Sequence, residues 1–119
     1  MPPSRTRQLS FSEHLRATRQ AKGLTQAELG RLMDLPDDVG QTRISRYEQG
    51  KHFPDPPAAE KLAKALGVPL AYLWASDDRQ AEIILGFAQL DKEQQDGLLG
   101  LLREFLGERE LDEASDGDT

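Results

Sequence analysis

The sequence predicts an all-α protein in which five short helices are followed by a further pair of helices. Apolar residues recur at the three- and four-residue spacing of amphipathic helices, capping signals precede several of these segments, and no segment alternates as a strand does. The 119 residues are enough for one small domain and one appendage. We therefore expect a helical domain over residues 10–75 and a helical region over residues 76–110.

The first two predicted helices each begin at a capping box, in which two side chains satisfy the first free backbone amides. The boxes pair Ser10 with Glu13 and Thr25 with Glu28. Gly23 is a suitable end for the first helix. The apolar positions of the two helices are Phe11, Leu15, Ala27, Leu29 and Leu32.

The third helix is predicted over residues 42–49, with Ile44 and Tyr47 as its inward pair. It follows an irregular stretch, residues 34–40, which contains proline and glycine. Leu29, Leu32 and Leu62 are the expected core partners of the third helix. Anchoring Ile44 and Tyr47 in the core turns the intervening side chains outward.

The fourth helix is expected over residues 58–66. A short fifth helix begins at Pro69, because proline suits the first turn of a helix. Trp74 is expected to close the core against this fifth helix rather than to serve as a ligand platform.

The last two helices are predicted over residues 79–90 and from a cap at Asp91 to about residue 110. Together they carry a long apolar stripe, and two short helices alone do not bury so much apolar surface. We therefore expect homodimerisation through this stripe, rather than an intramolecular hairpin. Its residues are Ile83, Ile84, Phe87, Leu98, Leu101, Leu102 and Phe105.

Charge divides the chain into two unlike parts. Residues 1–74 hold 11 basic and 8 acidic side chains, a net of +3, and residues 75–119 hold 4 and 13, a net of −9, giving −6 in total. A surface suited to nucleic acid can therefore lie on the first part alone. We expect residues 1–9 to form a flexible arm and residues 111–119 a disordered acidic tail.

Composition excludes several classes of protein. There is no cysteine, no apolar run that could cross a membrane and no secretory leader at the start. No acidic pair, nucleophile or histidine cluster has the spacing of a catalytic or metal site. We expect a cytoplasmic protein that is not an enzyme, has no catalytic residue, cofactor or metal, and does not contact a membrane.

Three segments in order carry a family resemblance: GLTQAELGRLM, TRISRYEQGK and PAAEKLAKALGVPLAYL. Over residues 11–74 the chain resembles the Cro/C1 family, also called the XRE family, of bacterial and phage regulators. The resemblance implies a five-helix phage-repressor-like DNA-binding domain whose second and third helices form a helix-turn-helix. It implies a sequence-specific transcriptional regulator that binds double-stranded DNA, which we expect to be a repressor acting as a homodimer on a palindromic operator.

The resemblance also assigns roles to side chains of the third helix. Base reading falls to Gln41, Thr42 and Arg46, while Arg43 is a candidate for either a base or a phosphate. The chemistry agrees, because glutamine pairs with adenine, arginine with guanine, and the threonine methyl contacts that of thymine.

Phosphate contacts are implied for Gln26 at the start of the second helix, where the helix N-terminus favours an anion. Lys51 and His52, after the third helix, are further phosphate candidates. Arg19 and Glu48 are expected to form a partly buried ion pair between the first and third helices.

One departure from the family pattern lies between the second and third helices, where about four extra residues occur. This insertion contains Asp34, Asp37 and Asp38 near the expected path of the phosphates. Two alternative functions remain open. One is an antitoxin-like module whose acidic C-terminal helices bind a partner protein, and the other is an adaptor that has lost DNA binding.

Overall fold

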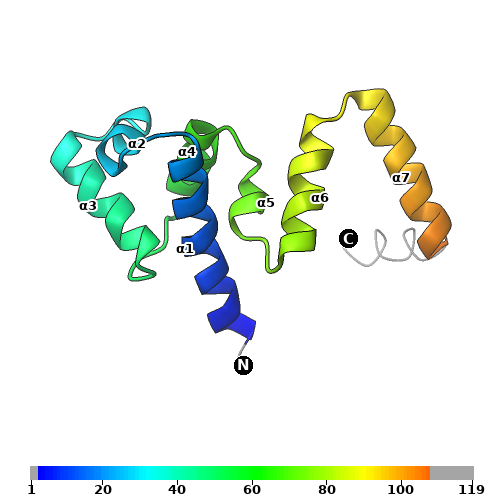
Figure 1. Ribbon diagram of the computed structural model, residues 1–119, viewed down its shortest axis with the longest axis horizontal. Helices are drawn as coiled ribbons and strands as arrows, with labels where there is room; N and C mark the ends of the chain where they lie inside the picture. The colour runs from blue at the N-terminus through cyan, green and yellow to red at the C-terminus, as the bar shows by residue number, and fades with distance from the viewer. Residues whose placement is uncertain (1–2, 108–119) are drawn as a thin grey trace. The chain divides into compact units, whose positions relative to one another are not determined.

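The computed structural model describes the backbone of residues 3–107 and the side chains from Phe11 to Gly107. This part of the chain contains seven α-helices and no strand (Figure 1), so the predicted all-α class is confirmed. Contacts divide the chain into two compact units, residues 1–85 and residues 86–119. No helix within the described part is long and apolar enough to span a membrane.

The first unit contains helices α1 to α5 and most of α6, Asp78–Gln89. The bounds of the first five helices are α1 Pro3–Ala21, α2 Gln26–Leu32, α3 Asp37–Glu48, α4 Pro56–Leu66 and α5 Leu70–Leu73. Helix α3 packs on α1 and α2, α4 packs on α2 and α5, and α1 also packs on α5. This arrangement encloses one core between the five helices.

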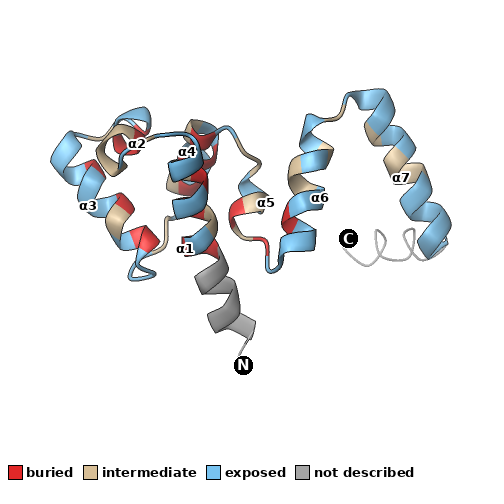
Figure 2. Cartoon of the chain, viewed as in Figure 1, coloured by how far each residue is buried: buried red, intermediate tan, exposed pale blue. Residues whose placement is uncertain are grey.

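Each of the helices α1 to α5 contributes buried residues to this core, which are red in Figure 2, and the largest of them are fully buried. Burying each of them contributes about 1.5–3 kcal/mol to folding. Trp74 lies against the core as predicted, with its ring stacked on Phe11 at a centroid distance of 4.3 Å. The fully buried large side chains are Phe11, Leu15, Leu29, Ile44, Leu62, Leu66 and Leu73.

Helix α1 begins at Pro3, so the structure has a helix where a flexible arm was predicted. The backbone of Ser10 is inside this helix, and the expected capping box with Glu13 does not begin it. The physical reason is local: proline has the φ angle of a first helical turn, and no glycine or proline interrupts residues 4–10.

The capping box of α2 forms as predicted. Thr25 Oγ1 accepts a hydrogen bond from the Glu28 amide at 3.0 Å, and Glu28 Oε1 accepts one from the Thr25 amide at 2.9 Å. The bond from the Thr25 amide lowers the pKa of Glu28. Replacing such a cap by alanine typically costs about 1 kcal/mol, so the box fixes where α2 begins.

Leu32 was expected in the core, but it is 56% exposed and Met33 is buried instead. Helix α2 ends at Leu32, and the chain then turns through Asp34, whose φ of 64° lies in the left-handed region. The turn directs Met33 into the core. The spacing of a helix that continued past Leu32 would not predict this.

Helix α3 begins at Asp37, five residues before the predicted start at Thr42. Pro36 precedes the helix, and Asp37 and Asp38 occupy its first turn, where acidic side chains favour the helix dipole. The extra turn fits because α2 and α3 meet at Gly30 and Gly40. A Cβ atom on Gly30 would lie 2.6 Å from the Gly40 Cα atom. The predicted insertion therefore forms the beginning of α3 from Asp37 onward, while Asp34 lies in the turn before the helix.

Helix α6, Asp78–Gln89, contains the division between the two units. Helix α7, Lys92–Leu106, begins at a capping box formed by Asp91 and Gln94. It ends at Leu106, and not near residue 110 as predicted, because Gly107 has a φ of 82° that stops the helix. The predicted acidic tail, residues 111–119, lies outside the described residues.

No residue of α7 is buried in the described chain. Its apolar side chains recur at the three- and four-residue spacing of one helix face. Phe105 is 79% exposed, so the last turns of this face are uncovered within the described residues. The exposed large apolar residues of α6 and α7 are Ile83, Leu101, Leu102, Phe105 and Leu106.

Candidate nucleic-acid interface

Helix α3 presents one side to the core and the opposite side to solvent. Ile44 is fully buried and Tyr47 is 5% exposed, so the two predicted anchors hold the helix. This orientation leaves the four predicted base-reading side chains exposed: Gln41, Thr42, Arg43 and Arg46.

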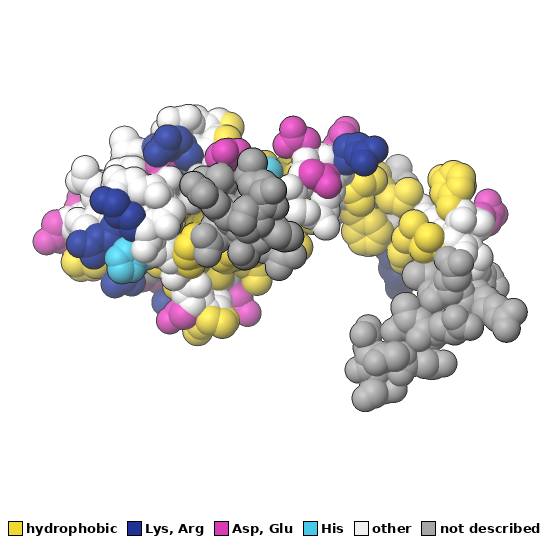
Figure 3. All heavy atoms as spheres, turned by 90° about the horizontal axis from the view of Figure 1, so that it is seen from below, with side chains coloured by type: hydrophobic (Ala, Val, Ile, Leu, Met, Phe, Trp, Pro, Cys, Tyr) yellow, Lys and Arg dark blue, Asp and Glu magenta, His cyan; other side chains and the backbone are white. Residues whose placement is uncertain are grey.

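The arginines of α3 differ from the other described arginines of α1 to α5 in their ion pairing. Within the described residues, Arg43 and Arg46 form no ion pair, whereas Arg16 and Arg19 of α1 and Arg31 of α2 are paired with acidic side chains. Basic side chains gather beside a histidine on one face of the first unit (Figure 3). Positive charge is therefore available along α3.

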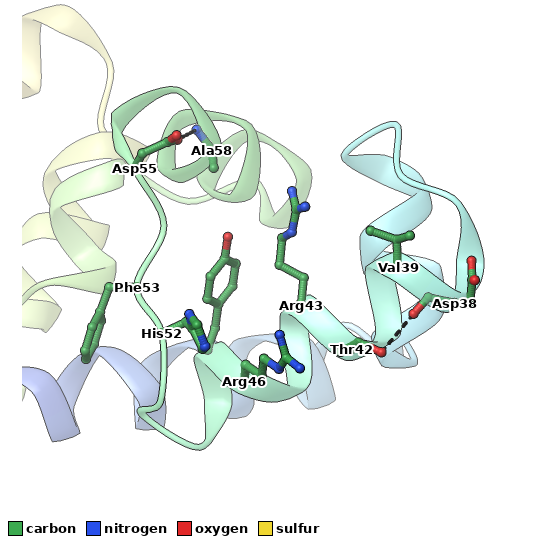
Figure 4. A pocket seen from close by; sticks show the side chains of 10 residues that line it. Asp38, Val39, Thr42, Arg43, Arg46, His52, Phe53, Asp55 and Ala58 are labelled. Carbon is green, nitrogen blue, oxygen red and sulfur yellow. Dashed lines mark hydrogen bonds between the residues drawn. The ribbon is translucent and has the colours of Figure 1, made fainter.

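Two hollows lie along α3, and both include Thr42 and Arg46 in their walls. The first is also lined by Gln26, Gln41, Ser45, Gln49 and Lys51. The second lies beside the loop between α3 and α4, and Figure 4 shows Arg43, Arg46 and His52 around it. The structure thus brings the predicted base and phosphate residues to one surface, divided by a ridge that contains Thr42 and Arg46.

The Thr42 side chain is fixed by its own helix. Its hydroxyl donates to the Asp38 carbonyl at 3.0 Å (Figure 4). The hydroxyl proton is therefore already engaged, and the methyl group is the part of Thr42 suited to an apolar contact.

Val39 lies in the second hollow, one turn before Arg43, and was not among the predicted site residues. It is 39% exposed and offers a second apolar contact of the kind that recognises a thymine methyl. The helical spacing from Val39 to Arg43 and Arg46 could have identified it, had α3 been extended to Asp37.

Glu48 is the centre of a buried polar cluster behind this surface. Arg19 donates to both carboxylate oxygens, from Nε to Oε2 at 2.6 Å and from Nη2 to Oε1 at 3.0 Å. The Arg19 and Glu48 side chains are 13% and 1% exposed, and the hydrogen bond from Arg19 to Glu48 raises the pKa of Arg19. The pair joins α1 to the end of α3.

Gln26 belongs to the same cluster. Its amide nitrogen donates to Glu48 Oε1 at 3.2 Å, and its side chain also lines the first hollow. One donor of the amide is engaged by Glu48, while the carbonyl oxygen and the second N–H form no hydrogen bond within the described residues. The start of α2 is thereby tied to the end of α3.

The acidic side chains near α3 are partly neutralised. Arg31 donates to Asp37 from Nε to Oδ1 at 2.8 Å and from Nη2 to Oδ2 at 3.2 Å. This pairing lowers the pKa of Asp37, so the carboxylate is charged but matched by a cation. Asp38 remains exposed in the first turn of α3 and lines the second hollow.

The described part of this surface contains no candidate metal site. Within residues 11–107 no group of three or more histidine or acidic side chains is placed to hold a metal ion. The surface offers amide and guanidinium donors on a rigid helix, which is the chemistry of recognition.

Comparison with known proteins agrees with this geometry. Residues 10–73 match the model of the helix-turn-helix domain family. The chain is also similar to the crystal structure of the transcriptional regulator BswR, with 32% sequence identity and a TM-score of 0.72. That match covers 78% of this chain and 92% of the other. A search of the curated proteins returned no match.

Proposed function

We propose that this chain, which belongs to the helix-turn-helix family, is a transcriptional repressor that binds a palindromic DNA operator as a homodimer. The observation that carries the proposal is the exposed side of α3, where Arg43 and Arg46 line the hollows and form no ion pair within the described residues. The similarity to a transcriptional regulator supports the same conclusion.

In this proposal α3 enters the major groove, which is wide enough to admit a helix. Arg46 pairs with guanine, Gln41 with adenine, and Thr42 places its methyl group against that of thymine. Ile44 and Tyr47 are buried and hold α3 against the core. They therefore fix how far the base-reading side chains extend from the domain. Specificity therefore depends on a rigid helix.

Phosphate contacts position the domain without reading bases. Gln26 and Lys51 line the first hollow, and in this proposal they meet one DNA backbone. His52 lines the second hollow. Glu48 holds Gln26 from behind through the 3.2 Å hydrogen bond.

The exposed apolar face of α7 supports dimerisation. A second copy of the same face covers it in a two-fold arrangement, and two α3 helices about 34 Å apart meet successive major grooves. The net charge of −9 on residues 75–119 keeps this region away from DNA. Repression follows if such a dimer occludes a promoter.

Replacing Arg46 by alanine is expected to weaken operator binding by about 1–3 kcal/mol and to relax preference at one base position. The measurement is selection of bound duplexes from a random pool, followed by titration of the selected sites. A Lys64→Ala variant is the control, because it removes an exposed positive charge from the last turn of α4 and is expected to retain the base preference.

Two outcomes of the selection contradict the proposal. No enrichment with the wild-type protein argues against sequence-specific DNA binding, and enrichment of sites without two-fold symmetry argues against the palindrome. Unchanged preference in the Arg46 variant removes this residue from base reading.

Replacing Phe105 by glutamate is expected to convert the dimer into a folded monomer, because a charge on the apolar face prevents its burial. Sedimentation measures the mass and circular dichroism the helical content. Arg103→Glu is the matched control, since Arg103 lies about 160° around α7 from Phe105 at ~100° per residue, away from the apolar face. A monomeric wild type refutes the homodimer and favours an antitoxin-like partner protein on this face.

A further inference from the structure

The second hollow contains a polar group that the proposed base reading does not use. The ring of Tyr47 belongs to the core and meets Phe11 edge-on, with a centroid distance of 6.5 Å. The residue is 5% exposed and also lines the hollow. Its hydroxyl forms no hydrogen bond within the described residues. A phenylalanine would fill the same core volume, so packing alone does not explain the hydroxyl.

The charges around the Tyr47 hydroxyl come from two elements. Arg43 from α3 and Asp55 from the following loop both act on it electrostatically, and both line the same hollow. Burial raises the pKa of Tyr47. Its hydroxyl is therefore protonated at neutral pH and able to donate a hydrogen bond into the hollow.

The acidic residues of the hollow do not neutralise its arginines. Asp55 is turned toward α4, where its Oδ1 accepts the Ala58 amide at 2.9 Å (Figure 4). Asp38 is in the first turn of α3. Within the described residues neither carboxylate forms an ion pair with Arg43 or Arg46.

We propose that this hollow is a phosphate site, in which the Tyr47 hydroxyl and the Arg43 guanidinium both donate to one phosphate of the DNA backbone. His52 lies at the same hollow and adds a further donor. The proposal rests on DNA binding by α3. It assigns Arg43 to phosphate contact and gives Tyr47 a role beyond the core.

The position of the hollow explains why a phosphate would meet it. A helix in the major groove has one DNA strand on each side. The first hollow, with Gln26 and Lys51, lies on one side of the Thr42–Arg46 ridge, and the second lies on the other. The two hollows therefore receive phosphates from opposite strands, which fixes the rotation of α3 about its own axis in the groove.

The first test replaces Tyr47 by phenylalanine and measures affinity for the selected operator. The expected result is a loss of about tenfold or more, the factor associated with one hydrogen bond to a charged acceptor. The thermal midpoint and the base preference should be unchanged. Tyr72→Phe is the matched control, because the Tyr72 ring lies tilted against His14, with a centroid distance of 4.9 Å, and does not line the hollow.

Arg43→Gln should weaken binding uniformly across sequences and reduce the slope of log affinity against log salt by about 0.9, the value for one phosphate. Lys64→Gln, an exposed charge on α4, should leave the slope unchanged. A change in base preference in the Arg43 variant would instead make Arg43 a base reader and overturn the assignment.

The decisive measurement combines Tyr47→Phe with operators that carry one neutral methylphosphonate at a time. One position in each half-site should show losses that are not additive with the loss of the hydroxyl. Additive losses at every position overturn the phosphate site while leaving DNA binding intact. Absence of DNA binding by the wild type refutes both the function and the site.

A final arm distinguishes a DNA phosphate from a free anion. Inorganic phosphate replaces chloride at constant ionic strength, and operator affinity is compared for the wild type and Tyr47→Phe. Equal effects on both proteins support DNA as the occupant. Competition that is seen with the wild type and lost in the variant shows that free phosphate and the DNA phosphate occupy the same hollow, which also supports the site.

Discussion

Replacing Glu48 by alanine is expected to lower the free energy of unfolding by about 3–5 kcal/mol, the cost of leaving a buried charge without its partner. Glu48 is 1% exposed and accepts three hydrogen bonds, two from Arg19 and one from Gln26. Without Glu48, the Arg19 side chain, which is 13% exposed in the intact protein, keeps only the Leu24 carbonyl, 2.8 Å away, as a hydrogen-bond acceptor. Chemical denaturation followed by circular dichroism gives the value.

The matched control for Glu48 is Asp37→Ala. Asp37 also forms a two-bond pair with an arginine, but its side chain and that of Arg31 are 59% and 60% exposed. Exposed pairs contribute little, because water screens them and their side chains lose entropy. The expected midpoint of unfolding is therefore close to that of the wild type. Equal losses in the two variants would contradict the buried role of Glu48.

Replacing Gly40 by alanine is expected to lower the free energy of unfolding by about 1–3 kcal/mol, the usual range for overpacking. The new Cβ atom would lie 2.9 Å from the Gly30 Cα atom. The obstacle is backbone and cannot move aside by changing rotamer. Helix α3 must therefore move away from α2, and operator affinity should fall together with stability.

Gly86→Ala is the control for Gly40→Ala. Gly86 is within α6, and a Cβ atom there would meet nothing within 4 Å. Alanine should stabilise this helix by about 0.5–1 kcal/mol, because glycine loses more conformational freedom on folding. A gain at Gly40 as well would show that α2 and α3 tolerate a wider separation, contrary to the contact seen between Gly30 and Gly40.

Much of the fold could be predicted because its signals are local. Capping at Thr25, the inward pair Ile44 and Tyr47, and the apolar spacing of α4 each depend on residues within one or two helical turns. The same spacing placed Arg43 and Arg46 on the exposed side of α3. The resemblance over residues 11–74 agreed with these local signals, and the family match over residues 10–73 confirms it.

The errors arose where a distant residue decides the outcome. Proline and glycine in residues 34–40 suggested a loop, but contact with Gly30 allows Gly40 to lie inside α3. Leu32 and Met33 are neighbours in sequence, and only the turn at Asp34 determines which of them is buried. Periodicity contains no information about such contacts.

By itself the sequence determined the helical class, most of the helices, the inward face of α3 and the separation of charge along the chain. It could do so because spacing and composition are properties of neighbouring residues. The tertiary structure alone decided where α3 begins and which acidic residues form ion pairs with arginines. It also decided that Tyr47 and Arg43 line the same hollow. These features depend on distances between α1, α2, α3 and the loop that follows, and packing sets those distances only when the whole core has formed.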